Sequence, residues 1–332
     1  MISIVVPTVG RPSLSVLLDR LDAELDGVDP AEYEIIVVDD RELRSGPAAT
    51  RNRGWRGARG EWVAFLDDDV VPDPGWWPAL RADLAVPAEV GGVQGRVRVP
   101  LPADRRPTDW ERNTAGLAGA PWITADMAYR RAALARVGGF DEAFPRAYRE
   151  DAELAYRVRA AGWELRRGGR TVAHPARPAG FWASVRTQAG NADDALLRRR
   201  YGRRWRALLE IPAGRRAWHA VICAAGVTAV TAATRRHSRA ARWVAGLGAA
   251  VWAAGTAEFA ARRIAPGPRT AREIATMVST SVLIPPVAIG YWIAGWARAA
   301  GGAEVVDVYF SSPRASAQRG SDQSDQCSSA PV

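Results

Sequence analysis

Three consecutive carboxylates, Asp67, Asp68 and Asp69, follow an apolar run at residues 62–66, and Pro72 then ends any regular continuation. A short apolar run of this kind is typical of a buried strand in a parallel sheet, where ligands bind at the carboxyl ends of the strands. Adjacent acids repel one another unless a cation lies among them, and Mg²⁺ is usually held by one or two carboxylates together with substrate phosphates. The triplet therefore predicts a nucleotide-diphosphate site, although acids are also common in solvated turns.

A second pair of carboxylates, Asp39 and Asp40, follows the apolar run at residues 33–38. The carboxyl ends of parallel strands meet at one edge of a sheet, so the two acidic segments are expected to lie close together. Two strands that both end in carboxylates favour a binding site over two unrelated turns.

Three further segments carry groups that could take part in chemistry. Glu150 and Asp151 stand at the start of a predicted helix, where the helix dipole stabilises acids, but two adjacent acids exceed what capping needs. His174 closes a predicted strand, and the pattern alone fits a structural histidine as well as a ligand. Arg51 could contact phosphate oxygens or lie on a solvated helix face.

Alternating strands and helices provide the scaffold for these side chains. Apolar runs and helical spacing alternate as strand, helix, strand, helix, strand, which indicates βαβ units and a parallel sheet. The predicted strands cover residues 2–6, 33–38, 62–67, 92–99 and 164–172, and the helices cover residues 13–25 and 48–58 and begin again at residue 150. The polar, proline-rich segment 100–112 is predicted to face a substrate.

The amino-acid composition indicates which classes of partner the chain could bind. The chain has 332 residues and a net charge of +9, and all 45 basic residues are arginine. Arginine-rich chains can bind nucleic acid, anionic lipid or phosphorylated substrates. Cys223 and Cys327 give neither a disulfide framework nor a metal-ligand spacing. The first residues lack a basic region and a long apolar stretch, so no cleavable signal is expected.

With these motifs in order, the chain resembles the family 2 glycosyltransferases of the GT-A fold over about residues 1–200. The stretches that carry the resemblance are residues 5–8, 37–40, 49–54, 61–69, 127–131, 137–142 and 150–151. The resemblance implies a mixed, mainly parallel α/β sheet with flanking helices. It also implies a nucleotide-sugar donor, Mn²⁺ or Mg²⁺ as cofactor, and inversion at the anomeric carbon.

The same resemblance implies roles for particular residues. The donor-binding residues would be Pro7, Thr8, Asp39 or Asp40, Arg51, Asp67 and Asp126. The metal-binding residues would be Asp67 and Asp69, the outer acids of an Asp-x-Asp motif, together with His174. Asp151 would be the general base, with Glu150 beside it.

Two departures from the family pattern leave the donor sugar open. Arg41 follows Asp40 where most members continue with Gly-Ser, and Arg149 precedes the Glu-Asp pair where many members have glycine.

The C-terminal third is predicted to associate with a membrane. The basic stretch 198–206, with Trp205, could lie on anionic lipid, form a solvated helix face or bind nucleic acid, and the last is disfavoured because no nucleic-acid module accompanies it. Apolar stretches follow at residues 217–234, 240–257 and 274–297, and a spanning helix needs about 20 such residues. The first two stretches could instead form a soluble bundle, and the number of spans stays open.

The predicted organisation has three parts. Residues 1–200 form the glycosyltransferase domain, residues 201–302 form a basic interfacial helix and hydrophobic helices, and residues 303–332 form a disordered tail. The expected location is the bacterial cytoplasmic membrane, with the catalytic domain in the cytoplasm.

The main hypothesis is an inverting, metal-dependent transferase that acts on an envelope glycan, a glycolipid or another lipid-linked acceptor, without nucleic acid. One alternative is an inactive family member that serves as a membrane-bound partner. Another is a nucleotidyltransferase, which would need a glycine-rich basic loop after the first strand, and residues 9–12 provide a poor one.

Overall fold

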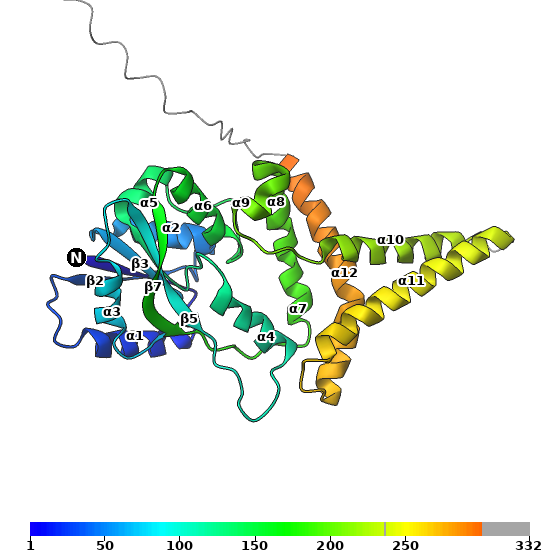
Figure 1. The fold of residues 1–332 in the computed structure, drawn as a ribbon, viewed down its shortest axis with the longest axis horizontal. Helices are drawn as coiled ribbons and strands as arrows, with labels where there is room; N and C mark the ends of the chain where they lie inside the picture. Colours follow the sequence, from blue (N-terminus) through cyan, green and yellow to red (C-terminus); the bar gives the residue numbers. More distant parts are fainter. Residues whose placement is uncertain (236, 301–332) are drawn as a thin grey trace, which may run out of the picture.

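A seven-stranded sheet organises the N-terminal part of the computed structural model, which describes residues 1–235 and 237–300 (Figure 1). The predicted tail at residues 303–332 lies outside the described residues. The strands are β1 (Ile2–Thr8), β2 (Tyr33–Asp39), β3 (Trp62–Leu66), β4 (Val71–Pro72), β5 (Val90–Arg98), β6 (Asp126–Arg130) and β7 (Glu164–Ala173). The principal helices of the same part are α1 (Ser13–Leu25), α2 (Pro47–Gly57), α3 (Trp76–Asp83), α4 (Asp109–Ala115), α5 (Arg131–Val137) and α6 (Glu150–Ala160).

The strand order, β2-β1-β3-β6-β5-β7-β4, is that of a mixed sheet. Strand β1 runs parallel to β2 and β3, and β5 runs parallel to β7, whereas β6 is antiparallel to both β3 and β5. The expected mixed α/β sheet with flanking helices is therefore confirmed. The carboxyl ends of β1, β2 and β3 meet at one edge, which brings Thr8, Asp40 and Asp67 together.

Helices cover both faces of the sheet because successive side chains of a strand point to opposite faces. Ile4 and Val6 belong to one core cluster with Leu17 of α1 and Leu80 of α3. Val5, between them, belongs to the other cluster, which packs against α2, α5 and α6. The central strands β1 and β3, which end beside Thr8 and Asp67, are thus buried on both faces, and they position the acidic edge that holds Asp40 and Asp67.

A third core cluster joins the basic stretch to the sheet domain. Trp205 of α9 (Trp205–Leu208) is 2% exposed and packs with Phe144, Leu197 of α8 (Asn191–Tyr201), Leu209 and Ile211. The expectation that Trp205 lies at a lipid interface is therefore wrong, because its indole fills a core. Since this cluster also includes Ala152 of α6, we propose that the domain predicted to end at residue 200 continues to about residue 211.

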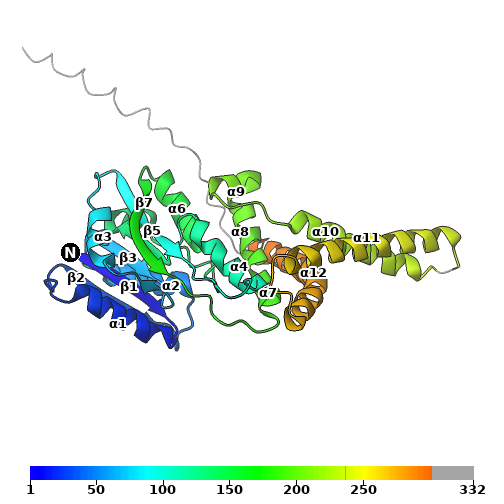
Figure 2. The same ribbon diagram turned by 60° about the horizontal axis from the view of Figure 1, so that its bottom comes forward.

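The remaining helices are α7 (Ala183–Arg186), α10 (Arg216–Ala233), α11 (Arg239–Ile264) and α12 (Ala271–Ala300). By length and composition, α10, α11 and α12 are each able to cross a membrane. Figures 1 and 2 show α10 and α11 projecting together away from the sheet, with α12 crossing their base. Helix α11 packs closely on α10 at Gly248, where a Cβ would lie 2.9 Å from the Ala225 carbonyl oxygen. Helix α12 packs closely on α8 at Gly295, where a Cβ would lie 2.6 Å from the Ala192 carbonyl oxygen.

The projecting helices α10 and α11 expose large apolar side chains, whereas α12 also packs against α8. Val230 of α10 is 70% exposed, and Trp243 and Leu247 of α11 are 73% and 69% exposed. Such a concentration of exposed apolar surface is typical of a membrane-contacting or protein-contacting region.

The buried position of Trp205 gives a test of the third cluster. Trp205→Ala is expected to lower the free energy of unfolding by about 3–5 kcal/mol, because it leaves a cavity among core side chains. Thermal unfolding of the detergent-purified chain measures the change. Trp243→Ala, at an exposed tryptophan, is the matched control and should leave the melting temperature nearly unchanged. Equal melting temperatures for the two variants would contradict the cluster.

Candidate active site

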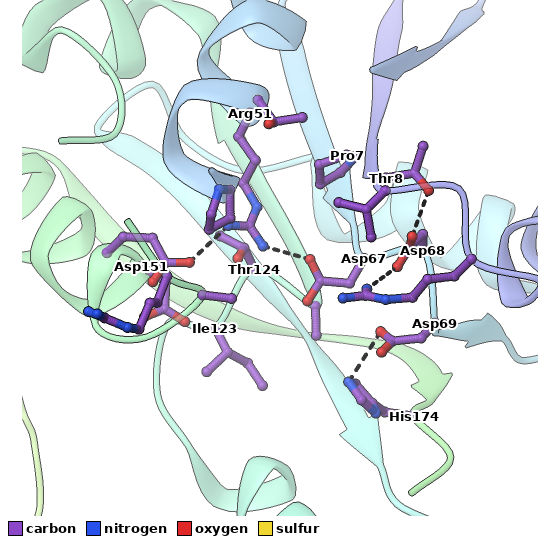
Figure 3. Close-up of a pocket in the computed structure, with 18 of the residues that line it drawn as sticks. Pro7, Thr8, Arg51, Asp67, Asp68, Asp69, Ile123, Thr124, Asp151 and His174 are labelled. Carbon is purple, nitrogen blue, oxygen red and sulfur yellow. Dashed lines mark hydrogen bonds and ion pairs between the residues drawn. The ribbon is translucent and has the colours of Figure 1, made fainter. Parts of the chain in front are cut away.

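A cavity of about 560 Å³ opens at the acidic edge of the sheet (Figure 3). Its walls come from the ends of β1 and β3, from α2 and α4, from the loop at residues 123–125, and from the start of α6. Of the predicted site residues, it brings together Pro7, Thr8, Asp40, Arg51, Asp67, Asp69, Glu150, Asp151 and His174.

Arg51 is the buried cation at one side of this cavity. Its side chain is 3% exposed, and it donates to Asp67 Oδ1 at 2.7 Å and to Glu150 Oε1 at 2.9 Å. Burial alone would lower the pKa of this guanidinium, but Asp67 and Glu150 outweigh that effect and hold it charged. Arg51 lines the cavity, as predicted for a donor-binding residue, and its two carboxylate contacts fix α2, the end of β3 and α6 relative to one another.

Glu150 and Asp151 begin α6 and present two carboxyl groups to the cavity. Arg149, just before them, has a backbone φ of +79°, a left-handed conformation that is uncommon for residues other than glycine. Burial is the main cause that raises the pKa of both acids, and for Glu150 the neighbouring charge of Asp151 adds to it. One Glu150 oxygen has no hydrogen-bond partner. A carboxylate with a raised pKa at a cavity wall is suited to take up a proton.

The loop that delivers these acids is held by α8. Arg146 makes two hydrogen bonds to Asp193, at 2.9 and 3.0 Å, and Arg149 Nε donates to Asp194 at 3.1 Å. Arg216 of α10 also contacts Asp194, at 3.2 Å. The start of α6 is therefore connected through buried carboxylates to the first apolar helix.

The three acids of the triplet have different surroundings. Asp68 is buried and accepts hydrogen bonds from Thr8 Oγ1 at 2.6 Å and from Arg11 at 2.5 Å, so it fixes the loop after β1. Asp67 contacts Arg51. Asp69 faces His174, whose Nε2 lies 3.4 Å from Asp69 Oδ1, and Arg177, whose Nε lies 3.2 Å from Oδ2. Burial and the charge of Asp67 raise the pKa of Asp69 despite these partners.

The residues at Asp69 fit an open site for a divalent metal. Within residues 1–235 and 237–300, no group of three or more His, Cys, Asp or Glu side chains is arranged to hold an ion. A pair of candidate ligands, Asp69 and His174, remains, with Nε2 of His174 at 3.4 Å from Oδ1 of Asp69. Such a pair fits Mg²⁺ or Mn²⁺ when phosphates and water supply the other ligands. Asp67, engaged by Arg51, is not grouped with them.

Two of the predicted donor-binding residues, Asp40 and Asp39, differ in their placement relative to the cavity. Asp40 lines the cavity, but its oxygens accept bonds from Ser45, Gly46 and Arg53 and hold the following loop. Asp39 pairs with Arg41 at an exposed position outside the cavity lining.

Asp126 also lies outside the cavity lining, which corrects the expectation of a place beside a donor sugar. It is fully buried, pairs with Arg170 at 2.7 Å and accepts from Trp76 Nε1 at 3.0 Å.

Sequence reasoning missed several residues of the cavity wall. Trp110, Asn113 and Thr114 enter it from α4, and Arg177 enters from the loop after β7. Trp110 lies in segment 100–112, which was expected to face a substrate. Nothing in the local pattern identifies Arg177, because its contact with Asp69 joins segments more than a hundred residues apart.

Part of the chain is similar to proteins of a known family. Residues 41–130 match the family described as "Glycosyl transferase family 2". The pre-mycofactocin glycosyltransferase of Mycobacterium tuberculosis is 33% identical over 137 residues, which cover 36% of this chain and 28% of that protein. The chain thus matches less than a third of the length of this curated relative.

Two solved structures are similar at low sequence identity. A mannosyltransferase from Pyrobaculum calidifontis in complex with GDP-Man and Mn²⁺ is 17% identical, with a TM-score of 0.49 and coverage of 89% of this chain and 86% of that one. A glucosyl-3-phosphoglycerate synthase from Mycobacterium tuberculosis, in complex with Mn²⁺, UDP-glucose and phosphoglyceric acid, is 16% identical, with a TM-score of 0.41 and coverage of 64% and 81%.

The raised pKa of Glu150 predicts a pH dependence of stability. Above its ordinary value of 4.5 the folded chain retains the proton that the unfolded chain has released, so the free energy of unfolding falls as the pH rises from there through the raised pKa. Glu150→Gln is expected to reduce this fall by at least about 1 kcal/mol.

Chemical denaturation at a series of pH values from 4.5 upward measures the fall. Glu89→Gln, at an exposed carboxylate, is the control and should keep the wild-type slope. A Glu150→Gln slope equal to that of the wild type would show that Glu150 titrates normally in the folded chain.

Proposed function

We propose that the chain transfers a sugar, with inversion and with a divalent metal, from a nucleotide-sugar donor to a glycan or lipid-linked acceptor. The match of residues 41–130 to the family described as "Glycosyl transferase family 2" supports this proposal. The observation that carries the proposal is the arrangement of one cavity. Two adjacent acids, the buried Glu150 and the partly buried Asp151, line the same 560 Å³ space as Asp69 and His174.

The donor would occupy the edge formed by β1 and β3. Pro7 and Thr8 would line the nucleobase and ribose, beside the wall that Asp40 stabilises. Asp69 and His174 would hold Mn²⁺ or Mg²⁺ against the diphosphate, and the metal would supply charge neutralisation for the departing nucleoside diphosphate. Arg11 lies beside Asp68 and would add positive charge near the same phosphates.

Asp151 is the proposed general base. The acceptor hydroxyl gives its proton to the Asp151 carboxylate while its oxygen bonds to the anomeric carbon, and the bond from that carbon to the diphosphate breaks. A single attack from the face opposite the diphosphate inverts the configuration. Glu150, bound to Arg51, would keep the loop and the start of α6 in place.

Membrane association is part of the proposal. The three long apolar helices support it, and the bacterial cytoplasmic membrane with a cytoplasmic catalytic domain is the proposed location, since nucleotide sugars are cytoplasmic. The link from Arg216 to Asp194 would place the catalytic acids at a fixed distance from that membrane.

Removal of the proposed metal contact tests donor binding. In Asp69→Ala, metal-dependent binding of the donor is expected to weaken by about tenfold or more, because one of only two protein ligands is lost. A panel of nucleotide sugars, titrated with and without Mn²⁺ into the detergent-purified chain, measures this. Asp73→Ala, at a carboxylate paired with Arg98 outside the cavity, is the control. Unchanged metal-dependent binding in Asp69→Ala would rule out this ligand.

Removal of the proposed base tests catalysis separately. Asp151→Asn keeps the shape of the side chain but is a far weaker base, so kcat is expected to fall by roughly two or more decades while donor binding persists. Product formation with a bound donor and an active acceptor gives kcat and KM. Turnover near the wild-type value would exclude Asp151 as the base. A catalytically inactive wild-type chain that still binds donor would instead indicate the partner role.

A further inference from the structure

A second cavity, of about 460 Å³, adjoins the first and has two of its wall residues, Trp110 and Arg177, in common with it. Its walls come from α4, from the loop at residues 176–184 and from the first turns of α12. Both ribbon views place α4, α7 and this end of α12 at the junction of the sheet domain and the apolar helices. The cavity thus extends the proposed catalytic centre toward the part of the chain that would contact a membrane.

The acids of this cavity already have partners. Asp109 pairs with Arg263 of α11 at 2.8 Å, Glu111 contacts Arg105 and caps α4 through Thr108, and Glu273 accepts the Asp109 N–H at 2.8 Å. These contacts also fix α4 to α11 and α12, so the cavity has a defined shape.

Two arginine side chains at this cavity, those of Arg177 and Arg272, make fewer contacts than its acids do. Arg272 makes no ion pair within the described parts of the chain, and Arg177 uses Nε on Asp69, which leaves its terminal nitrogens available. Two guanidinium groups at one cavity favour an anion with several oxygens, such as a phosphate.

Apolar side chains lie on α12 beside the same cavity. Phe181 and Met277 line the cavity, and Ile274, Val278 and Val282, which lie outside its lining, are 38%, 48% and 37% exposed. Their spacing of four residues places them on one face of the helix. A ligand that fits both features has an anionic head and a hydrocarbon chain.

We propose that this second cavity is the acceptor site and that the acceptor is a phosphorylated lipid, with its phosphate at Arg177 and Arg272 and its chain along Ile274, Val278 and Val282. This proposal rests on the proposed function. The phosphate is an anchor, and the hydroxyl that gives its proton to Asp151 belongs to a group attached to it that reaches past Trp110 into the first cavity. The bonds formed and broken are those of the transfer described above.

The experiment compares three probes on the full chain in detergent: farnesyl phosphate, farnesol and inorganic phosphate. Calorimetric titration should find the tightest binding for farnesyl phosphate, because only this probe uses both the arginines and the apolar face. Binding of inorganic phosphate or of farnesol that equals the binding of farnesyl phosphate would overturn the proposal, since a free-anion site or a nonspecific apolar surface would then account for the cavity.

Single substitutions test where on the chain farnesyl phosphate binds. Arg272→Ala should weaken farnesyl phosphate binding by about tenfold, which corresponds to the loss of one charge-assisted contact, and Val278→Ser should weaken it as well. Arg298→Ala, at an exposed arginine near the other end of α12, is the matched control and should bind as the wild type does.

Nucleotide-sugar titrations of the same variants separate the two proposals. Unchanged farnesyl phosphate affinity in Arg272→Ala, with metal-dependent donor binding intact, overturns the acceptor site alone. Absence of metal-dependent donor binding in the wild type contradicts the proposed function, and the acceptor role of the second cavity fails with it.

Discussion

The buried guanidinium of Arg51 is the contact on which the acidic edge depends. It is 3% exposed and joins Asp67 to Glu150, which come from opposite sides of the cavity. The Arg51 guanidinium thus lies near three acids: Asp67 and Glu150, which it contacts, and Asp151, which follows Glu150 in the chain. Breaking a buried ion pair by removing one partner costs about 3–5 kcal/mol, so loss of Arg51 would release both β3 and α6. Burial disfavours the charged forms of Glu150 and Asp151, and Asp69, which lines the same cavity, is where we propose that a metal adds positive charge.

A second set of contacts connects the walls of the cavity to the apolar helices. Asp193 and Asp194 of α8 hold Arg146 and Arg149 ahead of the acid pair, and Arg216 of α10 meets Asp194 from the other side. On α11, Arg263 contacts Asp109 of α4, whose neighbour Trp110 lines both cavities. The helices that would meet a membrane are thus attached to two walls of the proposed catalytic centre.

Local sequence predicts the parts of this structure that depend on local forces. β-branched runs identify β1 and β2, an apolar run identifies β3, and the predicted helix at residues 13–25 matches α1. The acids at strand ends could be assigned to one edge because parallel topology brings them together. Pairings over long distances could not be predicted: Asp126 meets Arg170, Trp205 meets Phe144, and Arg177 meets Asp69. In each case the side chain has a plausible surface role in its own segment, and only the tertiary fold supplies its partner.

The most direct test of the central claim is the position of a metal in a nucleotide complex. Crystals of the full chain grown with Mn²⁺ and a nucleoside diphosphate, UDP or GDP, would give an anomalous difference map. The account predicts a manganese peak between Asp69, His174 and the two phosphates, with the base against Pro7 and Thr8. A nucleotide bound elsewhere, or a nucleotide at this edge without manganese at Asp69, would contradict it.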